Sequence, residues 1–401
     1  MSLRVAIVGG GIGGTAAALF LHRAGVEVTV YEQARELTEI GAGIVIAPNM
    51  ARLMRKLGVA DELAACAVRL EAAWEFRRWS DGRVLFVQPM GEACERLYGA
   101  HCYVAHRADL LAVLHRALPR ELVRLDHRCV EVEQSERDAR LTFASRTGTT
   151  IPATADVVVG ADGIHSVVRQ AIGASVVARF AGLCAFRCLV PAELAPEMAV
   201  RPVQTLWLGP GRHFVHYPIS AGRLVNVVAF VPAGDWRTES WTAAGEVADL
   251  RAEFAAWDAR VGQLIDAATR TTRWAVYDRD PLARWTCGRI ALLGDAAHPM
   301  LPFFAQGAAQ ALEDAVVLAG CLRDCDDAPE ALERYERLRR PRASHVQLMS
   351  RGRELENHLP DGPEQEARDA RLVGGQPLAD NAWLYGHEAE AALDSDGSVR
   401  P

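Results

Sequence analysis

The sequence predicts an α/β protein in which a parallel-sheet domain is interleaved with an antiparallel-sheet domain and followed by C-terminal helices. The first observation is a buried strand at Val5–Val8, a glycine turn, a helix over Gly13–Ala24 and a second strand at Glu27–Tyr31. The second is that similar apolar runs return much later, at 155–159 and 289–293, as in parallel sheets that are buried on both faces. The third is the change to β-favouring runs such as LVNVVAFV between about 176 and 270, which indicates an antiparallel sheet.

The remaining elements follow from glycine, proline and helical spacing. We expect a loop over 38–49, a helix through Leu57, a long helix over 306–322 and another from Pro329. The tail after Asn357 is expected to be irregular apart from 383–393. The predicted division is a discontinuous dinucleotide-binding domain (1–75, 100–175 and 271–345), a substrate domain (76–99 and 176–270) and a C-terminal helical or irregular tail (346–401).

Composition excludes several classes of protein. The 401 residues include 44 Lys+Arg and 51 Asp+Glu, and the net charge of −7 argues against a nucleic-acid or anionic-membrane partner. No apolar stretch approaches the roughly 18 residues of a membrane span. The nine scattered cysteines show no metal-ligand spacing, so we expect reduced thiols, no metal and a cytoplasmic protein. The basic run Arg337–Arg342 is expected to form a solvated helix face.

A phosphate-binding turn follows the first strand. Gly9, Gly11 and Gly14 form GxGxxG between a strand and a helix, where they permit a tight turn, close approach to a pyrophosphate and close helix packing. Glu32 ends the next strand, where a carboxylate can accept hydrogen bonds from ribose hydroxyls. This pattern indicates a Rossmann-like dinucleotide site, but alone it does not separate NAD from FAD.

Two later motifs and one arginine favour FAD. Asp162-Gly163 resembles the DG motif of flavoprotein hydroxylases, and GDAAHP (294–299) resembles their GD motif, in which Asp295 would hold the ribityl hydroxyls. Arg107 in HRADLL matches the ribityl-contacting arginine of that family. Over residues 3 to about 350 the chain resembles the group A flavoprotein monooxygenases, which implies a p-hydroxybenzoate hydroxylase-type fold and bound FAD.

Four longer segments indicate which members of this family the chain resembles most. EIGAGIVIAPN, LWLGPGRHFVHYP, YDRDPLARWTCGRIALLGDAAHPM and AQGAAQALEDAVVLAGCL resemble the cluster of 3-hydroxybenzoate 6-hydroxylase, salicylate hydroxylase and 6-hydroxynicotinate 3-monooxygenase. This resemblance implies that NADH or NADPH reduces the FAD and that a flavin C4a-hydroperoxide formed with O2 hydroxylates a small aromatic acid. Gly307 and Ala308 would open a helix whose N–H groups face the flavin pyrimidine.

Two residues are candidates for the proton chemistry. In a strand, His213 and Tyr217 share one face and His216 points to the other. By resemblance, His213 would be the base or hydrogen-bond acceptor for the substrate hydroxyl and Tyr217 its orienting partner. The side chains expected to line the apolar substrate pocket and to keep water from the flavin are Val45, Leu301, Pro302 and Phe303.

Three alternatives remain open at this stage. A 6-hydroxynicotinate-type pyridine hydroxylase would share every motif, but its relatives carry polar groups where this chain has Val45, Pro302 and Phe303. A flavin-dependent reductase or dehydrogenase would reduce the flavin but give no oxygenated product. A non-catalytic flavin-binding protein would show no substrate-stimulated NAD(P)H oxidation. A homodimer is possible on this sequence.

Overall fold

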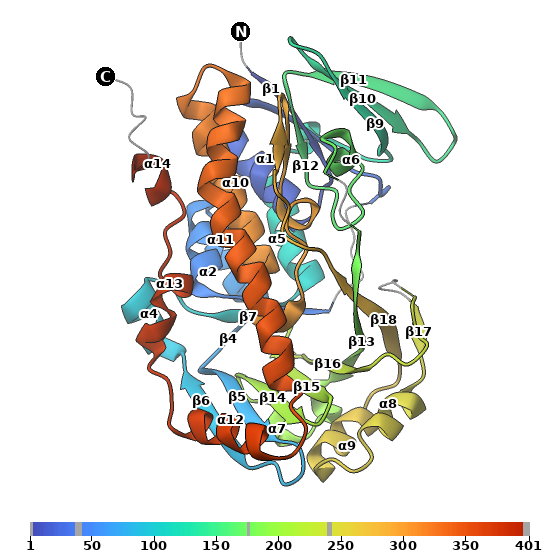
Figure 1. Cartoon of the computed structure of the whole chain (residues 1–401), viewed down its shortest axis with the longest axis vertical. Coiled ribbons are helices and arrows are strands. Elements are labelled where there is room, and N and C mark those ends of the chain that lie inside the picture. The colour runs from blue at the N-terminus through green and yellow to red at the C-terminus, as the bar shows by residue number, and fades with distance from the viewer. Residues whose placement is uncertain (1–2, 37–41, 175–176, 239–242, 396–401) are drawn as a thin grey trace.

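A six-stranded sheet forms the upper layer of the molecule (Figure 1). The computed structural model describes residues 3–36, 42–174, 177–238 and 243–395. Strands β1 (Arg4–Val8), β2 (Glu27–Tyr31), β12 (Val157–Gly160) and β20 (Ile290–Leu292) are parallel. Apart from β2, which buries only Val28 and Val30, these strands are apolar runs buried on both faces. The strand order is β19-β20-β12-β1-β2-β8, with β8 at Val123–Arg124 and the antiparallel β19 at Thr286–Cys287.

Helices pack against this sheet. Helix α1 (Ile12–Arg23) buries Ala16, Ala17 and Ala18 completely, since only small side chains fit where it lies close to the sheet and to α10 (Gly307–Asp324). The other helices of this part of the chain are α2 (Pro48–Lys56), α3 (Ala60–Cys66), α4 (Gly91–Tyr98), α5 (Arg107–Ala117) and α6 (Val168–Ala171).

An eight-stranded sheet forms the lower layer (Figure 1). Its order is β17-β18-β13-β16-β15-β14-β5-β6, and apart from the parallel pair β14–β5 its strands are antiparallel. The bounds are β5 (Ala72–Arg78), β6 (Val84–Pro89), β13 (Arg179–Pro191), β14 (Val203–Gly209), β15 (Arg212–Ile219), β16 (Leu224–Pro232), β17 (Ala244–Gly245) and β18 (Thr271–Asp278). Helices α7 (Glu197–Val200), α8 (Val247–Glu253) and α9 (Ala259–Asp266) accompany it.

Two three-stranded sheets complete the β-structure of the described residues. One has the order β11-β10-β9 and contains Arg128–Gln134, Ala139–Ala144 and Thr150–Ala155. The other has the order β3-β7-β4 and contains Gly43–Ile46, Val68–Arg69 and Tyr103–His106. The predicted α/β class, with parallel and antiparallel sheets and C-terminal helices, is confirmed. The predicted domain boundaries at 75/76 and 270/271 coincide with β5 and the start of β18, and the domain division remains a prediction.

The long helix α11 (Ala328–Asn357) connects the two layers, running from the six-stranded sheet down to β14 and β15 (Figure 1). After it, α12 (Pro363–Val373), α13 (Ala382–Tyr385) and α14 (Ala391–Ser395) return along the outside of the molecule. The expectation of an irregular tail before residue 383 is therefore wrong. Pro363 occupies the first turn of α12, where its missing N–H costs nothing, and Gln365, Arg368 and Asp369 are buried against the rest of the chain.

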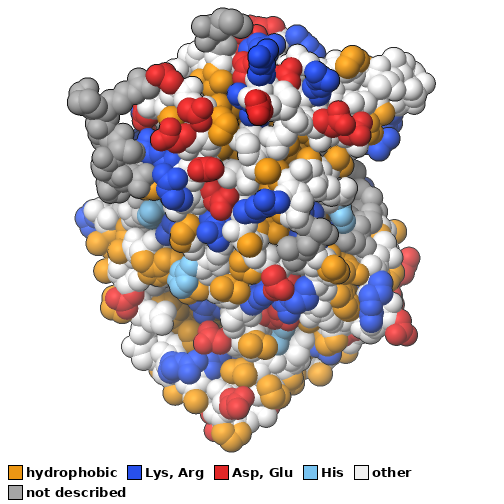
Figure 2. Space-filling view, turned by 45° about the horizontal axis from the view of Figure 1, so that its top comes forward, with side chains coloured by type: hydrophobic (Ala, Val, Ile, Leu, Met, Phe, Trp, Pro, Cys, Tyr) orange, Lys and Arg blue, Asp and Glu red, His pale blue; other side chains and the backbone are white. Residues whose placement is uncertain are grey.

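Two further expectations need correction. The predicted loop over 38–49 contains β3, which pairs with β7, and residues 38–41 lie outside the described part. The run Arg337–Arg342 is not simply a solvated face, because Arg339 is buried against Glu313 and Asp314. On the face shown in Figure 2, basic and acidic side chains are interspersed. None of the described helices has the length and apolar character needed to cross a membrane.

Candidate active site

The glycine turn after β1 has the geometry expected for a pyrophosphate site. A Cβ on Gly9 would lie 2.4 Å from the carbonyl oxygen of Ala161, and one on Gly14 would lie 2.0 Å from that of Gly9. A Cβ on Gly11 would meet nothing within 4 Å. Two glycines are therefore required for packing, and the third leaves its backbone open to a phosphate at the start of α1.

Glu32 lies beside this turn. Its Oε2 accepts a hydrogen bond from the backbone N–H of Gly10 at 2.7 Å, and its Oε1 accepts one from Ala34 at 2.8 Å. Each carboxylate oxygen keeps a lone pair, so the group can still accept from a ribose hydroxyl. The side chain is thus fixed in orientation at the end of β2, next to the glycine turn.

The DG loop is joined to both neighbouring motifs. The N–H of Ala161 donates to the carbonyl of Val8 at 2.8 Å, and Oδ2 of Asp162 accepts from Val167 at 2.7 Å. Oδ1 of Asp162 is buried and has no partner among the described residues, and burial raises the pKa of this carboxyl. Arg169 donates from Nη1 to the carbonyl of Ala296, which ties the DG loop to the GD loop.

The GD loop lies at the N-terminus of α10. Asp295 is exposed between the buried Gly294 and Ala296, and its Oδ1 lies 4.0 Å from the position of a Cβ on Gly307. Arg107 is half-buried, and burial lowers its pKa while the charge of Asp295 raises it. No side chain caps the start of α10, so the N–H groups of its first turn remain available to a ligand. Asp295, Gly307 and Arg107 thus converge on one region.

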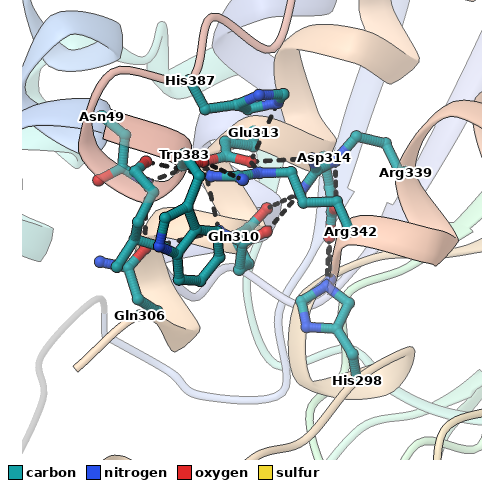
Figure 3. Close-up of polar contacts among 12 residues, drawn as sticks. Asn49, His298, Gln306, Gln310, Glu313, Asp314, Arg339, Arg342, Trp383 and His387 are labelled. Atoms are coloured by element: carbon teal, nitrogen blue, oxygen red, sulfur yellow. Dashed lines mark hydrogen bonds and ion pairs between the residues drawn. The ribbon is translucent and has the colours of Figure 1, made fainter. Parts of the chain in front are cut away.

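Charged side chains of α10 and of α11 form a buried network next to the start of α10 (Figure 3). Arg339 binds Oε2 of Glu313 from Nη1 at 2.8 Å and Oδ1 of Asp314 from Nε at 2.9 Å, and all three side chains are at most 1% exposed. Nε2 of His298 lies 2.5 Å from Oδ2 of Asp314. The network therefore fixes the GD loop from inside.

The same network reaches the start of α10 and the C-terminal segment. Asn49 donates from Nδ2 to Gln306 at 3.0 Å and to Glu313 at 2.8 Å, which joins the residue before α10 to helix α2. Arg342 binds Glu313 from Nε at 2.8 Å and donates from Nη1 to the carbonyl of Trp383 at 2.8 Å. Residues from four distant parts of the chain thus support one helix end.

The eight-stranded sheet presents the other candidates on one face. His213, Val215 and Tyr217 alternate along β15 and face the apolar clusters that contain Phe303 and Val45, whereas Phe214 packs on the opposite side. His213 stacks on Phe230 with ring centroids 4.6 Å apart, and Phe303 meets its edge at 5.3 Å. The alternation expected from the sequence is present.

Register places polar groups beside Tyr217. Tyr217 pairs with Asn226 of β16, whose Oδ1 accepts from the N–H of Gly43 at 2.7 Å and whose Nδ2 is buried without a partner among the described residues. Arg187 of β13 pairs with Val228, one row away on the same face, and its guanidinium lies 3.8 Å from the centroid of Trp274. Burial lowers the pKa of Arg187 to about 9 and raises that of Tyr217 above its ordinary value.

Three of the four residues predicted to line the pocket are buried, and one is exposed. Leu301 and Phe303 are buried beside Phe230 and Trp274, and Val45 is buried in the cluster of Tyr217. Pro302 is exposed. Three residues near His213 and Tyr217 were not named from the sequence: Arg187, Asn226 and His358, whose Nε2 lies 2.6 Å from Nδ1 of His213. Arg187 and Asn226 could have been found from strand alternation, but nothing near His358 in the sequence points to His213.

Comparison with known proteins identifies the family. A family model described as FAD binding domain matches residues 2–350. The chain belongs to this FAD-binding family. A relative from Streptomyces platensis, 45% identical over 387 residues and 96% of each chain, is named 3-amino-4-hydroxybenzoate 2-monooxygenase PtmB3. Another, from Bordetella bronchiseptica, is 36% identical over 86% of this chain and 90% of its own and is named 6-hydroxynicotinate 3-monooxygenase.

A solved structure agrees with these matches. A salicylate hydroxylase in complex with its substrate superimposes with a TM-score of 0.83 at 28% identity, covering 98% of this chain and 97% of that one. The resemblance to FAD-dependent aromatic hydroxylases and the prediction of FAD as the cofactor are therefore confirmed. The protein is an FAD-dependent monooxygenase of the aromatic-ring class. The roles of individual site residues remain predictions.

Proposed function

We propose that the protein hydroxylates the ring of a small phenolic carboxylic acid, of the hydroxybenzoate or aminohydroxybenzoate type, with NAD(P)H and O2 as co-substrates. The observation that carries this proposal is the shared face of β15, where His213 and Tyr217 lie beside Phe303 and Asn226. The name of the relative that is 45% identical makes 3-amino-4-hydroxybenzoate the first substrate to test.

FAD fits the cradle formed by the three motifs. The residues proposed to hold it are Gly9, Gly11, Gly14, Glu32, Arg107, Asp162, Asp295, Gly307 and Ala308. The open backbone at Gly11 suits the pyrophosphate, and the exposed carboxylate of Asp295 suits the ribityl hydroxyls. When bound, FAD supplies the redox chemistry, taking a hydride from NAD(P)H and passing one oxygen atom of O2 to the ring.

The chain's own residues position the ring and move its proton. A phenol becomes a stronger nucleophile as its hydroxyl proton leaves, and a neutral imidazole can accept that proton. Burial and the nearby His358 hold the pKa of His213 well below its ordinary value, so its ring is neutral at pH 7. We assign His213 as the acceptor and the hydroxyl of Tyr217 as the group that orients the substrate.

The substrate carboxylate and the apolar walls complete the assignment. Arg187 lies one row from Tyr217 on the same face of the sheet, and we assign its guanidinium to the carboxylate. Val45, Leu301 and Phe303 provide the apolar surface that excludes water from the reaction. These apolar side chains favour a benzoate ring over the pyridine ring of the 6-hydroxynicotinate relatives.

Rapid-reaction kinetics with a substrate panel test this function. Hydroxybenzoates, aminohydroxybenzoates and hydroxypyridine carboxylates are screened for stimulated NAD(P)H oxidation and for the mass of the product. His213→Ala should lower the rate of ring hydroxylation by a factor of about 10² to 10⁴. Tyr217→Phe should lower it about tenfold or more, and in both variants the rate of flavin reduction should change little.

His216→Gln is the matched control, because His216 lies on the same strand and makes no hydrogen bond among the described residues. It should retain hydroxylation. A flavin that is reduced but yields no oxygenated product with any panel member would instead identify a reductase. If no panel member stimulates NAD(P)H oxidation, the protein is a flavin-binding protein without this activity.

The cellular and oligomeric predictions are also proposals. We propose a cytoplasmic protein that forms a homodimer, and light scattering on the purified protein measures its mass directly. A mass near the 43.6 kDa of the chain would contradict the dimer.

A further inference from the structure

A second histidine reaches His213 from the C-terminal part of the chain. His358 follows the last residue of α11, and its Nε2 lies 2.6 Å from Nδ1 of His213, 145 residues earlier. The N–H of Gly211 donates to the carbonyl of His358 at 3.0 Å, which fixes the backbone of α11's end to the turn before β15. The contact between the two rings is therefore held by both backbone and side chain.

The pair leads from the interior towards the surface. His213 is 1% exposed and lies between Phe230 and Phe303, whereas His358 is partly exposed. Phe303 also meets the edge of the His358 ring, with centroids 6.1 Å apart. The same apolar side chain thus contacts both imidazoles, and the more exposed end of the pair is at His358.

The short distance between the two nitrogens determines where the protons lie. Only one proton fits between Nδ1 of His213 and Nε2 of His358, and burial holds both rings neutral, lowering the pKa of His358 to about 4. If His213 donates that proton, its own Nε2 is bare and can accept from a phenol. The reverse tautomer would place a proton on Nε2 of His213 and prevent it from accepting.

We propose that His358 is a proton-relay residue that carries the substrate's phenolic proton from His213 to solvent. This proposal rests on the proposed function of His213. The phenol O–H bond breaks as Nε2 of His213 takes the proton, and Nδ1 of His213 releases its own proton to Nε2 of His358. Nδ1 of His358 then gives a proton to water. One proton leaves for each phenolate formed, no electron moves, and the buried site never keeps an imidazolium. The same transfers run backwards when the phenolic oxygen takes up a proton again, and this returns both rings to the starting tautomers.

A lasting positive charge on His213 is unfavourable in this position. Burial and the neighbouring His358 ring lower the pKa of His213, and burial lowers the pKa of His358. No carboxylate of the described residues is bonded to either ring. An imidazolium at His213 would therefore have the phenolate itself as a counter-ion but no carboxylate among the described residues, and transfer of its second proton outward removes the buried positive charge.

The relay can be measured without turnover. Oxidised FAD-loaded enzyme binds 3-hydroxy-4-nitrobenzoate, whose phenolate absorbs visible light, and a stopped-flow pH jump records how fast the phenolate forms. His358→Gln keeps a hydrogen-bonding group but cannot carry a proton, so phenolate formation should slow by about tenfold or more. Added imidazole should restore the rate in His358→Ala. His345→Gln, an exposed histidine of the same helix, is the matched control and should leave the rate unchanged.

The outcomes separate this proposal from the assignment of His213. If His358→Gln and His358→Ala form phenolate at the parent rate while His213→Ala is slow, the relay is wrong and the base stands. If His213→Ala is also unchanged, the base assignment fails too. Nitrogen-15 NMR of the parent protein is independent of any variant. Before ligand binds, a His213 ring with its proton on Nε2 would overturn the relay, and one protonated on Nδ1 supports it.

Discussion

The buried arginine behind α10 yields the sharpest prediction for stability. Arg339 neutralises Glu313 and Asp314 in a site where all three side chains are at most 1% exposed, and it also donates to Oε1 of Gln310 at 2.9 Å. Replacing it with leucine leaves two carboxylates short of a counter-charge. Removing one partner of a buried ion pair costs about 3–5 kcal/mol. Because Arg342 and His298 still contact the carboxylates, we expect a loss of about 3 kcal/mol.

The matched control is the next residue of the same helix. Arg340 pairs with Glu336 at 3.2 Å, but its side chain is 39% exposed. Such a surface pair contributes about 0.3–0.5 kcal/mol, so Arg340→Leu should change stability very little. Urea unfolding of both variants, followed by circular dichroism at equal FAD concentration, measures the difference. A loss in Arg339→Leu no larger than that in Arg340→Leu would refute the reasoning.

The pH dependence supplies a second measurement on the same variant. Burial opposes ionisation of Glu313 and Asp314, but the neighbouring cations hold the pKa of each carboxyl below its ordinary value. In the parent this stabilisation is complete above the ordinary carboxylate pKa and is lost as pH falls through the lowered folded value. Without Arg339, burial should raise both pKa values. Protonation then relieves the charge, so the loss of stability should be smaller at pH 5 than at pH 8.

Three other substitutions test the site. Asp295→Ala should weaken FAD binding by about 1–3 kcal/mol in a fluorescence titration, with a smaller loss in Asp295→Asn; unchanged affinity would contradict the GD assignment. Phe303→Ser should raise the H2O2 formed per NAD(P)H oxidised, and Phe303→Leu should not, because the serine admits water; equal coupling in both variants and parent would remove Phe303 from the site. Gly43→Ala should displace the ring of Tyr217, since a Cβ would lie 2.5 Å from its Cε2, and should lower hydroxylation while FAD content is retained. Gly352→Ala, where a Cβ meets nothing within 4 Å, is its control, and equal hydroxylation in the two would show that Tyr217 does not need its place.

The local sequence was sufficient to predict the glycine turn after β1 and to predict which side chains of β15 share one face. The demands on Gly9, Gly11 and Gly14 come from a strand, a turn and a helix that are adjacent in the chain. His213 and Tyr217 share a face because strand side chains alternate. Both predictions needed only the period of a known element, so they could be made before the tertiary structure was known.

Interactions that depend on distant segments could not be predicted in this way. An arginine-rich helix usually lies in solvent, and Arg339 is buried only because Asp314 and Glu313, 25 and 26 residues earlier, lie against it. His358 follows a long polar helix, and its contact with His213 depends on where α11 ends. The helix α12 was missed because its polar composition resembles that of a loop.

The charged network behind α10 includes a segment that is synthesised later than the residues proposed to bind FAD. Every residue proposed to hold FAD precedes Gln310, but the carbonyl groups of Trp383 and Leu384 that Arg342 binds are made only after α11 is complete. An N-terminal nucleotide fold can form during translation, as domains generally do. The charged network behind α10, however, can close only after the chain has been synthesised as far as Leu384. A nascent chain can therefore recognise the nucleotide end of FAD before it can hold the helix that faces the flavin ring.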